Sequence, residues 1–148
     1  MLINGFARGL KTSKFFNTGT LDCNNKFVVS DRMFGSAMAL TFPDVDRTRF
    51  LMVIGGNPAI SKMSFINLPH PMDRLKAITE RGGRVVFVNP RRTESAKVCG
   101  EQVFVRPDTD VFFLLSFLHE VLQRKAYKRD VVDPFMDGFA ALQAVADD

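Results

Sequence analysis

The chain has 148 residues, which is enough for one ordinary hydrophobic core and too few for two full domains. Hydrophobic residues make up 46% and charged residues 24%, a balance that excludes a disordered tail and predicts a folded protein. The net charge of +4 suits an anionic ligand, but no Lys/Arg block with interleaved aromatic residues occurs, so we expect no nucleic-acid partner.

The N-terminal third has an irregular pattern. Its first 21 residues carry Arg8, Lys11 and Lys14 and no acidic residue, as a transit peptide would. The glycines of this stretch are expected to break a sustained amphipathic helix, so we predict a cytoplasmic protein without a targeting segment. A loop is predicted over residues 17–25 and a helix over residues 27–38.

The middle of the chain alternates short apolar runs with longer periodic segments, as βαβ units do. The apolar runs Phe50–Ile54 and Arg84–Val88 predict buried strands, and residues 102–105 predict a third strand. Between the first two, residues 72–81 predict a crossover helix. The fold class predicted is therefore α/β, with three layers and a mainly parallel, Rossmann-like sheet.

The C-terminal part is predicted to be helical. The acidic turn at residues 108–110 supplies an N-cap and first-turn acids for a helix that reaches Gln123. A short piece over residues 131–136 and an Ala-rich helix over residues 139–146 follow. No apolar run approaches the roughly 20 residues that a spanning helix needs, so no membrane span is expected. The predicted apolar face of the long helix consists of Phe113, Leu114, Phe117, Leu118, Val121 and Leu122.

Three loops follow the predicted strands, where open parallel sheets bind their ligands. In the first, residues 55–61, Gly55 and Gly56 allow close backbone approach and Asn57 offers hydrogen-bonding groups. A tight turn from strand to loop is the alternative interpretation.

The second loop, residues 89–95, offers a polar Asn89 and two guanidinium groups, Arg91 and Arg92, whose geometry matches phosphate. The alternative is that Thr93 caps a short helix and that both arginines are solvated.

The third loop, residues 106–110, carries carboxylates. A carboxylate here can accept the paired N1 and N2 donors of guanine, which adenine does not present. Simple helix capping is the alternative. Neither a GxGxxG fingerprint nor a GxxxxGK[ST] loop occurs, so an ordinary NAD or FAD domain and a P-loop are not supported.

In the same order, these loops resemble the GxNP, DPR-T-x-TA and PGTD segments of the molybdopterin oxidoreductases, the dimethyl sulfoxide reductase family. The resemblance covers nearly the whole chain. Segments upstream at residues 44–46 and downstream at residues 137–139 are also similar to family features. In this chain the three corresponding segments are Gly55-Gly56-Asn57-Pro58, Asn89-Pro90-Arg91-Arg92-Thr93-Glu94-Ser95-Ala96 and Pro107-Asp108-Thr109-Asp110.

The resemblance implies a bis-molybdopterin guanine dinucleotide cofactor with molybdenum or tungsten, of which this chain would hold one guanine nucleotide. Asp110 would be the carboxylate that reads guanine. Asn89 and Asp108 depart from the Asp and Gly that the family usually has there. The other residues that the resemblance assigns to the cofactor are Gly55, Gly56, Asn57, Pro58, Asn89, Pro90, Arg91 and Thr93.

A segment at residues 18–25 resembles the one that brings the protein's own ligand to the metal. Asp22 is the expected metal ligand and Cys23 the alternative, since both a carboxylate and a thiolate suit molybdenum. Cys23 also reads as a small buried hydrophobe. The two histidines, His70 and His119, have no partner pattern and are interpreted as structural.

We therefore expect a single partial domain, with a segment on the metal-ligand side over residues 1–47 and a Rossmann-like part over residues 48–148. The family's cysteine cluster for an iron-sulfur centre and its long C-terminal region are not in this sequence, so catalysis by this chain alone is not expected. The leading interpretation is a fragment or subunit of a molybdopterin-dependent oxidoreductase.

Two other interpretations stay open. One is a non-catalytic nucleotide-binding, pterin-binding or assembly module, and the other is an inactive remnant. The expected partners are the cofactor and either the remainder of the enzyme or a partner subunit. Exposed apolar surface is expected to promote self-association in each case.

Overall fold

The computed structural model describes residues 2–14, 16, 24–39, 41–62 and 68–147. The chain divides into two compact units, Met1–Pro43 and Asp44–Asp148. Each unit is described by itself below.

The first unit contains two helices, α1 (Leu2–Gly9) and α3 (Asn24–Phe34). Helix α3 begins and ends earlier than the predicted range of 27–38, and Gly35 follows it with a φ of 71°, the left-handed conformation typical of a helix terminus. Gly5, one of the glycines expected to break a sustained helix, lies inside α1, which ends at Gly9. A single helical glycine costs only about 1 kcal/mol, and α1 is short.

The second unit is built on a parallel sheet of three strands in the order β1-β2-β3. The strands β1 (Phe50–Ile54) and β2 (Arg84–Val88) have the predicted bounds. The third strand, β3, covers Glu101–Val103 and is shorter and earlier than predicted. Two interactions account for the shift: Arg84 forms a bidentate pair with Glu101 at 3.0 and 2.9 Å, and the N–H of Asn89 donates to the carbonyl of Val103, after which the ladder ends.

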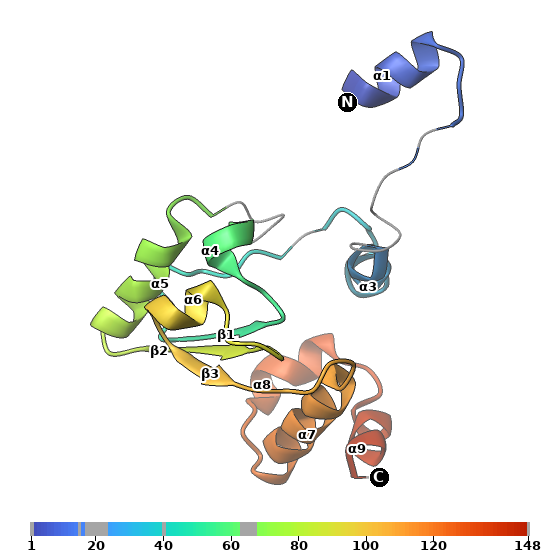
Figure 1. The fold of residues 1–148 in the computed structure, drawn as a ribbon. Coiled ribbons are helices and arrows are strands. Elements are labelled where there is room, and N and C mark those ends of the chain that lie inside the picture. Colours follow the sequence, from blue (N-terminus) through green and yellow to red (C-terminus); the bar gives the residue numbers. More distant parts are fainter. Residues whose placement is uncertain (1, 15, 17–23, 40, 63–67, 148) are drawn as a thin grey trace. The chain divides into compact units, whose positions relative to one another are not determined.

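Helices connect these strands in the manner of βαβ units, which confirms the α/β class with a parallel sheet. Helices α4 (Pro58–Ser61) and α5 (Pro71–Glu80) lie between β1 and β2, and α6 (Glu94–Val98) lies between β2 and β3. Figure 1 shows α4, α5 and α6 together on one side of the sheet. The predicted crossover helix over residues 72–81 is α5, displaced by one residue.

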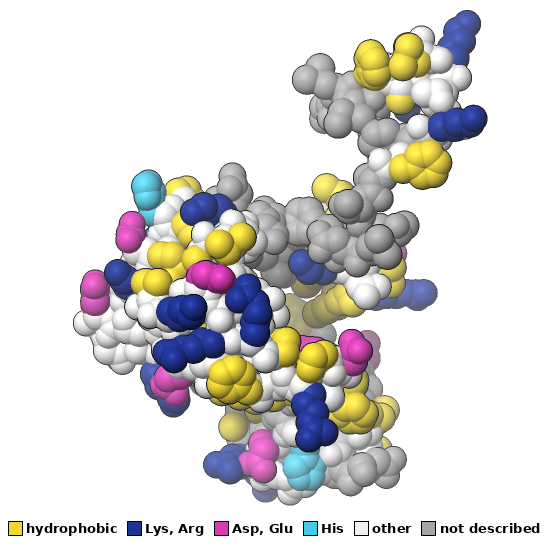
Figure 2. Space-filling view, viewed as in Figure 1, with side chains coloured by type: hydrophobic (Ala, Val, Ile, Leu, Met, Phe, Trp, Pro, Cys, Tyr) yellow, Lys and Arg dark blue, Asp and Glu magenta, His cyan; other side chains and the backbone are white. Residues whose placement is uncertain are grey.

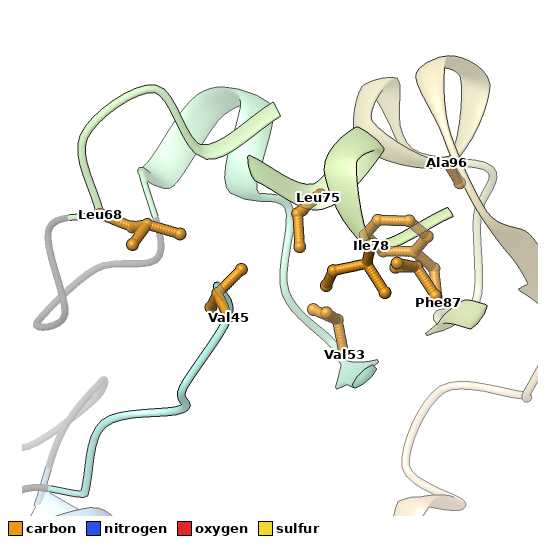
Figure 3. Close-up of a cluster of buried hydrophobic side chains, with 8 residues drawn as sticks. Val45, Val53, Leu68, Leu75, Ile78, Phe87 and Ala96 are labelled. Carbon is orange, nitrogen blue, oxygen red and sulfur yellow. The ribbon is translucent and has the colours of Figure 1, made fainter. Parts of the chain in front are cut away.

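The main core lies between the sheet and these helices (Figure 3). Val85 and Phe87 of β2 point toward the helical side, where Leu75 and Ile78 of α5 meet them, and all four side chains are almost fully buried. Gly83 permits this close packing, because a Cβ atom there would lie 2.6 Å from a backbone oxygen.

Arg81, at the end of α5, fastens the segment that leads into β1. Its Nη2 donates to the carbonyls of Val45 and Thr48, each at 2.6 Å, and its Nε donates to Thr48 at 3.2 Å. These charged hydrogen bonds hold Val45 in the core beside Leu75.

The C-terminal part contains α7 (Asp110–Gln123), α8 (Arg129–Val132), the 3-10 helix η2 (Asp133–Phe135) and α9 (Phe139–Asp147). Helix α7 packs against α9, and a hydrogen bond of 2.7 Å joins His119 Nδ1 to the carbonyl of Ala146. Among the helices of the described ranges, none is long and apolar enough to cross a membrane.

Helix α7 has the predicted acidic residue, Asp110, in its first turn and ends at Gln123 as predicted, but its cap differs from the expectation. Thr109 occupies the N-cap position, but its hydroxyl donates to the carbonyl of Arg106 at 2.7 Å instead of capping the helix. The predicted apolar face is only partly covered: no residue of α7 is buried, Leu114 and Phe117 are exposed, and the other four residues of the face are half-buried. The spacing identified the apolar residues correctly, but their burial requires a partner that spacing does not supply.

Candidate functional site

The three loops named in the sequence follow three adjacent parallel strands, so they begin at the same edge of the sheet. Because β3 ends at Val103, the third loop begins two residues earlier than predicted, and we call residues 55–61, 89–95 and 104–110 the carboxyl edge. The N–H of Gly55 donates to the carbonyl of Val88 at 2.8 Å, and Asn89 donates to Val103 at 3.1 Å. These bonds fix where each loop leaves the sheet.

The first loop needs both of its glycines, for different reasons. Gly55 has a φ of 69°, in the left-handed region that favours glycine. At Gly56 a Cβ atom would lie 2.8 Å from a methyl carbon of Val53 in the core. Pro58 is buried at the first position of α4, where its ring suits the helix start.

Hydrogen bonds join the first loop to the second. Asn57 Oδ1 accepts from the Ser95 hydroxyl at 2.7 Å and from the Ser95 N–H at 3.3 Å. Asn57 Nδ2 donates to Glu94 Oε2 at 2.6 Å, and Ser95 Oγ accepts from the N–H of Ala59 at 2.9 Å. The two loops are therefore one connected polar structure.

The predicted residues of the second loop differ in burial: two are buried and two are exposed. Asn89 is only 8% exposed, and its Oδ1 accepts from the N–H of Arg91 at 3.2 Å. Thr93 is 1% exposed and caps α6 by accepting from Ala96 at 3.2 Å, so the capping interpretation is confirmed for this residue. Pro90 and Arg91 are exposed.

Glu94 is the charged centre of this loop. Its carboxylate pairs with Arg91 at 3.2 Å. A hydrogen bond from its own N–H, followed by those from Arg91 and Asn57, lowers the pKa of Glu94 to about 2. The carboxylate is therefore ionised at neutral pH, and the charge of Arg91 is balanced within the loop.

The third loop presents Asp108 and Asp110, both exposed, with Asp108 at a φ of 63°. Asp110 is the first residue of α7. Within the described ranges the Asp110 carboxylate has neither a hydrogen bond nor an ion pair, so its oxygens are open to a ligand.

Two exposed cations, Arg92 and Arg106, stand on the second and third loops. Neither guanidinium forms an ion pair with any residue that the structure describes. Figure 2 shows Lys and Arg side chains gathered on one face of this unit over α6 and the neighbouring strands. This surface is suited to an anionic ligand.

The predicted metal ligands, Asp22 and Cys23, lie outside the described residues. The described part of the chain contains no group of three or more His, Cys, Asp or Glu that could hold a metal ion. Cys99, the residue that follows α6 in the chain, is half-buried, and burial raises the pKa of its thiol. His119 ties α7 to α9, in agreement with a structural role.

The sequence pattern places Glu94 and Ser95 in the second loop but indicates no role for either residue. The structure shows that both contact Asn57, which lies 37 and 38 positions away. A local pattern contains no signal for a contact at that separation. The strand order alone could have suggested it, since adjacent parallel strands bring consecutive loops together.

Comparisons with known proteins relate the chain to longer enzymes. The assimilatory nitrate reductase catalytic subunit of Bacillus subtilis is 24% identical over 99% of this chain and 20% of that protein. A sulfite dehydrogenase subunit of Allochromatium vinosum is 32% identical over 77% of this chain and 11% of that protein. No family model matches the chain.

The fold has a counterpart among solved structures. Acetylene hydratase from Pelobacter acetylenicus matches with a TM-score of 0.70 and 22% identity, over 89% of this chain and 17% of that one. The chain spans between 8% and 21% of the length of the first curated relatives that it matches. On the evidence of these relatives, the chain belongs to the molybdopterin oxidoreductase family.

Proposed function

We propose that the carboxyl edge binds the guanine nucleotide part of a molybdopterin guanine dinucleotide cofactor, as one part of a molybdopterin-dependent oxidoreductase. The observation that carries this proposal is the meeting of three family-like loops at one edge of a parallel sheet. Such a cofactor supplies two-electron redox chemistry or oxygen-atom transfer at molybdenum or tungsten. This chain's residues would bind and orient it.

The residues present fit a guanine nucleotide. Asp110 offers two open carboxylate oxygens, which match the N1 and N2 donors of guanine. Adenine presents no such donor pair, so the same carboxylate would discriminate between the two bases. Asp108, where the family usually has Gly, has a φ of 63°, and its exposed side chain forms no ion pair with any described residue.

The phosphates would meet the first two loops. Gly55 and Gly56 carry no side chain that blocks approach to the backbone, and beyond Gly55 and its two chain neighbours no described atom lies within 4 Å of the place where a Cβ of Gly55 would be. Arg92 offers a guanidinium that is not balanced within the loop, whereas Arg91 is paired with Glu94. We therefore assign the stronger phosphate contact to Arg92.

The protein ligand to the metal is proposed from the family resemblance alone. Asp22 would supply it, with Cys23 as the alternative, and both belong to the first unit.

Calorimetric titration of the purified chain with GDP and with ADP tests this function. We expect saturable binding of GDP and at least tenfold weaker binding of ADP. Asp110→Ala should weaken GDP binding by roughly ten- to one-hundredfold, as expected for the loss of a bidentate base contact of about 1–3 kcal/mol. The affinity for ADP should not change.

Asp130→Ala is the matched control, since it removes an exposed carboxylate from α8 outside the carboxyl edge. It should bind GDP as the wild type does. Equal affinities for GDP and ADP, or an Asp110→Ala variant that binds GDP normally, would reject the guanine-binding role.

A further inference from the structure

Two short helices start directly beyond neighbouring strands and pack against each other: α4 after β1 and α6 after β2. A helix start leaves backbone N–H groups without partners inside the helix. Usually the side chain of the N-cap residue satisfies one of them. Asn57 is the N-cap residue of α4, yet its side chain makes no capping bond to α4.

The Asn57 side chain instead reaches the start of the other helix. Its Oδ1 accepts from the N–H of Ser95, the second residue of α6, and from the hydroxyl of the same residue. Ser95 in turn supplies the acceptor at the start of α4 that the Asn57 side chain does not. Its Oγ accepts from the N–H of Ala59, the second residue of α4. Each helix start therefore receives a hydrogen bond from a side chain of the other loop, and at α6 this bond adds to the cap that its own Thr93 supplies.

The exchange leaves little freedom to either side chain. Ser95 is 0% exposed, and its hydroxyl both donates to Asn57 and accepts from Ala59. Asn57 Oδ1 accepts two bonds, while Nδ2 is committed to Glu94 at 2.6 Å. The carboxamide orientation is fixed by this arrangement, because only an NH₂ group can donate to the ionised Glu94.

We propose that Asn57 and Ser95 form a reciprocal capping clamp that holds the first two loops of the carboxyl edge in their binding geometry. Both are positioning residues, and neither carboxamide nor hydroxyl is the main contact to the nucleotide. The inference rests on the proposed function and changes the role of Asn57, which the family resemblance assigned to direct contact. A clamp of this kind removes the cost of ordering the loops when the ligand binds.

A charge-exchange cycle at Asn57 and Glu94 tests the clamp. Asn57→Asp keeps an acceptor for Ser95 but places a carboxylate against that of Glu94, so the loops should separate. We expect GDP affinity to fall by about tenfold or more. Glu94→Gln in the same chain restores a donor and acceptor pair, now from Gln to Asp, and the double variant should recover most of the affinity.

Gln143→Glu is the matched control, since it adds the same charge at an exposed position of α9. It should leave GDP affinity unchanged. An Asn57→Asp variant that binds GDP like the wild type contradicts the positioning role. A double variant that binds GDP no better than Asn57→Asp also contradicts it. Repulsion between residues 57 and 94 would be relieved by Glu94→Gln, whereas a general loss of stability would not.

Amide hydrogen exchange on the free chain gives a readout that needs no ligand and no Asn57 variant. The N–H of Ala59 should exchange slowly in the wild type and much faster in Ser95→Ala, while the N–H of the buried Ile78, in the last turn of α5, keeps its protection. Unchanged exchange at Ala59 would reject the clamp. Failure of the wild type to bind GDP while Ala59 responds in this way would instead reject the nucleotide role and leave the clamp as a purely structural device.

Discussion

The second unit contains two regions rich in apolar residues, and these residues are buried in one region and largely exposed in the other. In the sheet region, Val85, Phe87 and Val88 of β2 are almost fully buried. Helix α7 is also rich in apolar residues, but none of its residues is buried and Phe112 is 66% exposed. Figure 2 shows hydrophobic side chains on the surface of this helical part.

The difference shows that apolar sequence and apolar burial are separate properties. A helix that is hydrophobic around most of its circumference is usually found inside a larger structure. Within the described part of the chain, α7 meets only the short helix α9 to any extent. We therefore expect the sheet region to determine the stability of the second unit and α7 to determine its association.

The largest expected effect is at the centre of the sheet. Phe87→Ala removes a ring that is 0% exposed and belongs to the core cluster with Ile78 and Ala96. The loss of burial and the cavity left behind should lower the free energy of unfolding by about 3–5 kcal/mol. Urea denaturation followed by circular dichroism measures this change. A loss below about 1 kcal/mol would show that this core is not the main source of stability.

The same substitution on α7 makes the comparison sharper. Phe112→Ala removes an identical side chain from an exposed position, so the free energy of unfolding should change by no more than about 0.5 kcal/mol. Because the exposed ring contributes to an apolar surface, self-association should decrease. Sedimentation velocity over a range of concentrations checks this. A wild-type chain that stays monomeric throughout, or a strongly destabilised variant, would contradict our view of α7.

The smallest expected effect is the pH dependence of stability that comes from Glu94 in the second loop. Because the pKa of Glu94 is lowered to about 2 from an ordinary value of 4.5, its interactions contribute fully above pH 4.5. That contribution should be lost as the pH falls from about 4.5 toward 2. Unfolding curves across this pH range for the wild type and Glu94→Gln measure it. The difference between the two proteins should shrink on acidification, and a constant difference would rule out the lowered pKa.

The candidate site was predictable in part. The apolar runs before Gly55 and Asn89 identified two strands with the observed bounds, and the parallel order expected of βαβ units brings their loops to one edge. The interpretation of Thr93 remained divided between ligand contact and capping until the bond to Ala96 was seen. The contact between Asn57 and Ser95 was not predictable from either local pattern, because each residue satisfies a helix start in the other loop.

The sequence by itself determined the class of fold, the two central strands, the crossover helix and the order of the loops. Those features depend on the period of apolar residues and on glycine and proline, which act over a few neighbouring positions. Only the tertiary structure decided where β3 ends, which side chain bonds to the start of α4, that Asn57 bonds to the start of α6, and that α7 stays exposed. These outcomes depend on hydrogen bonds and contacts between residues far apart in the chain, whose free energy exists only once the elements have packed together.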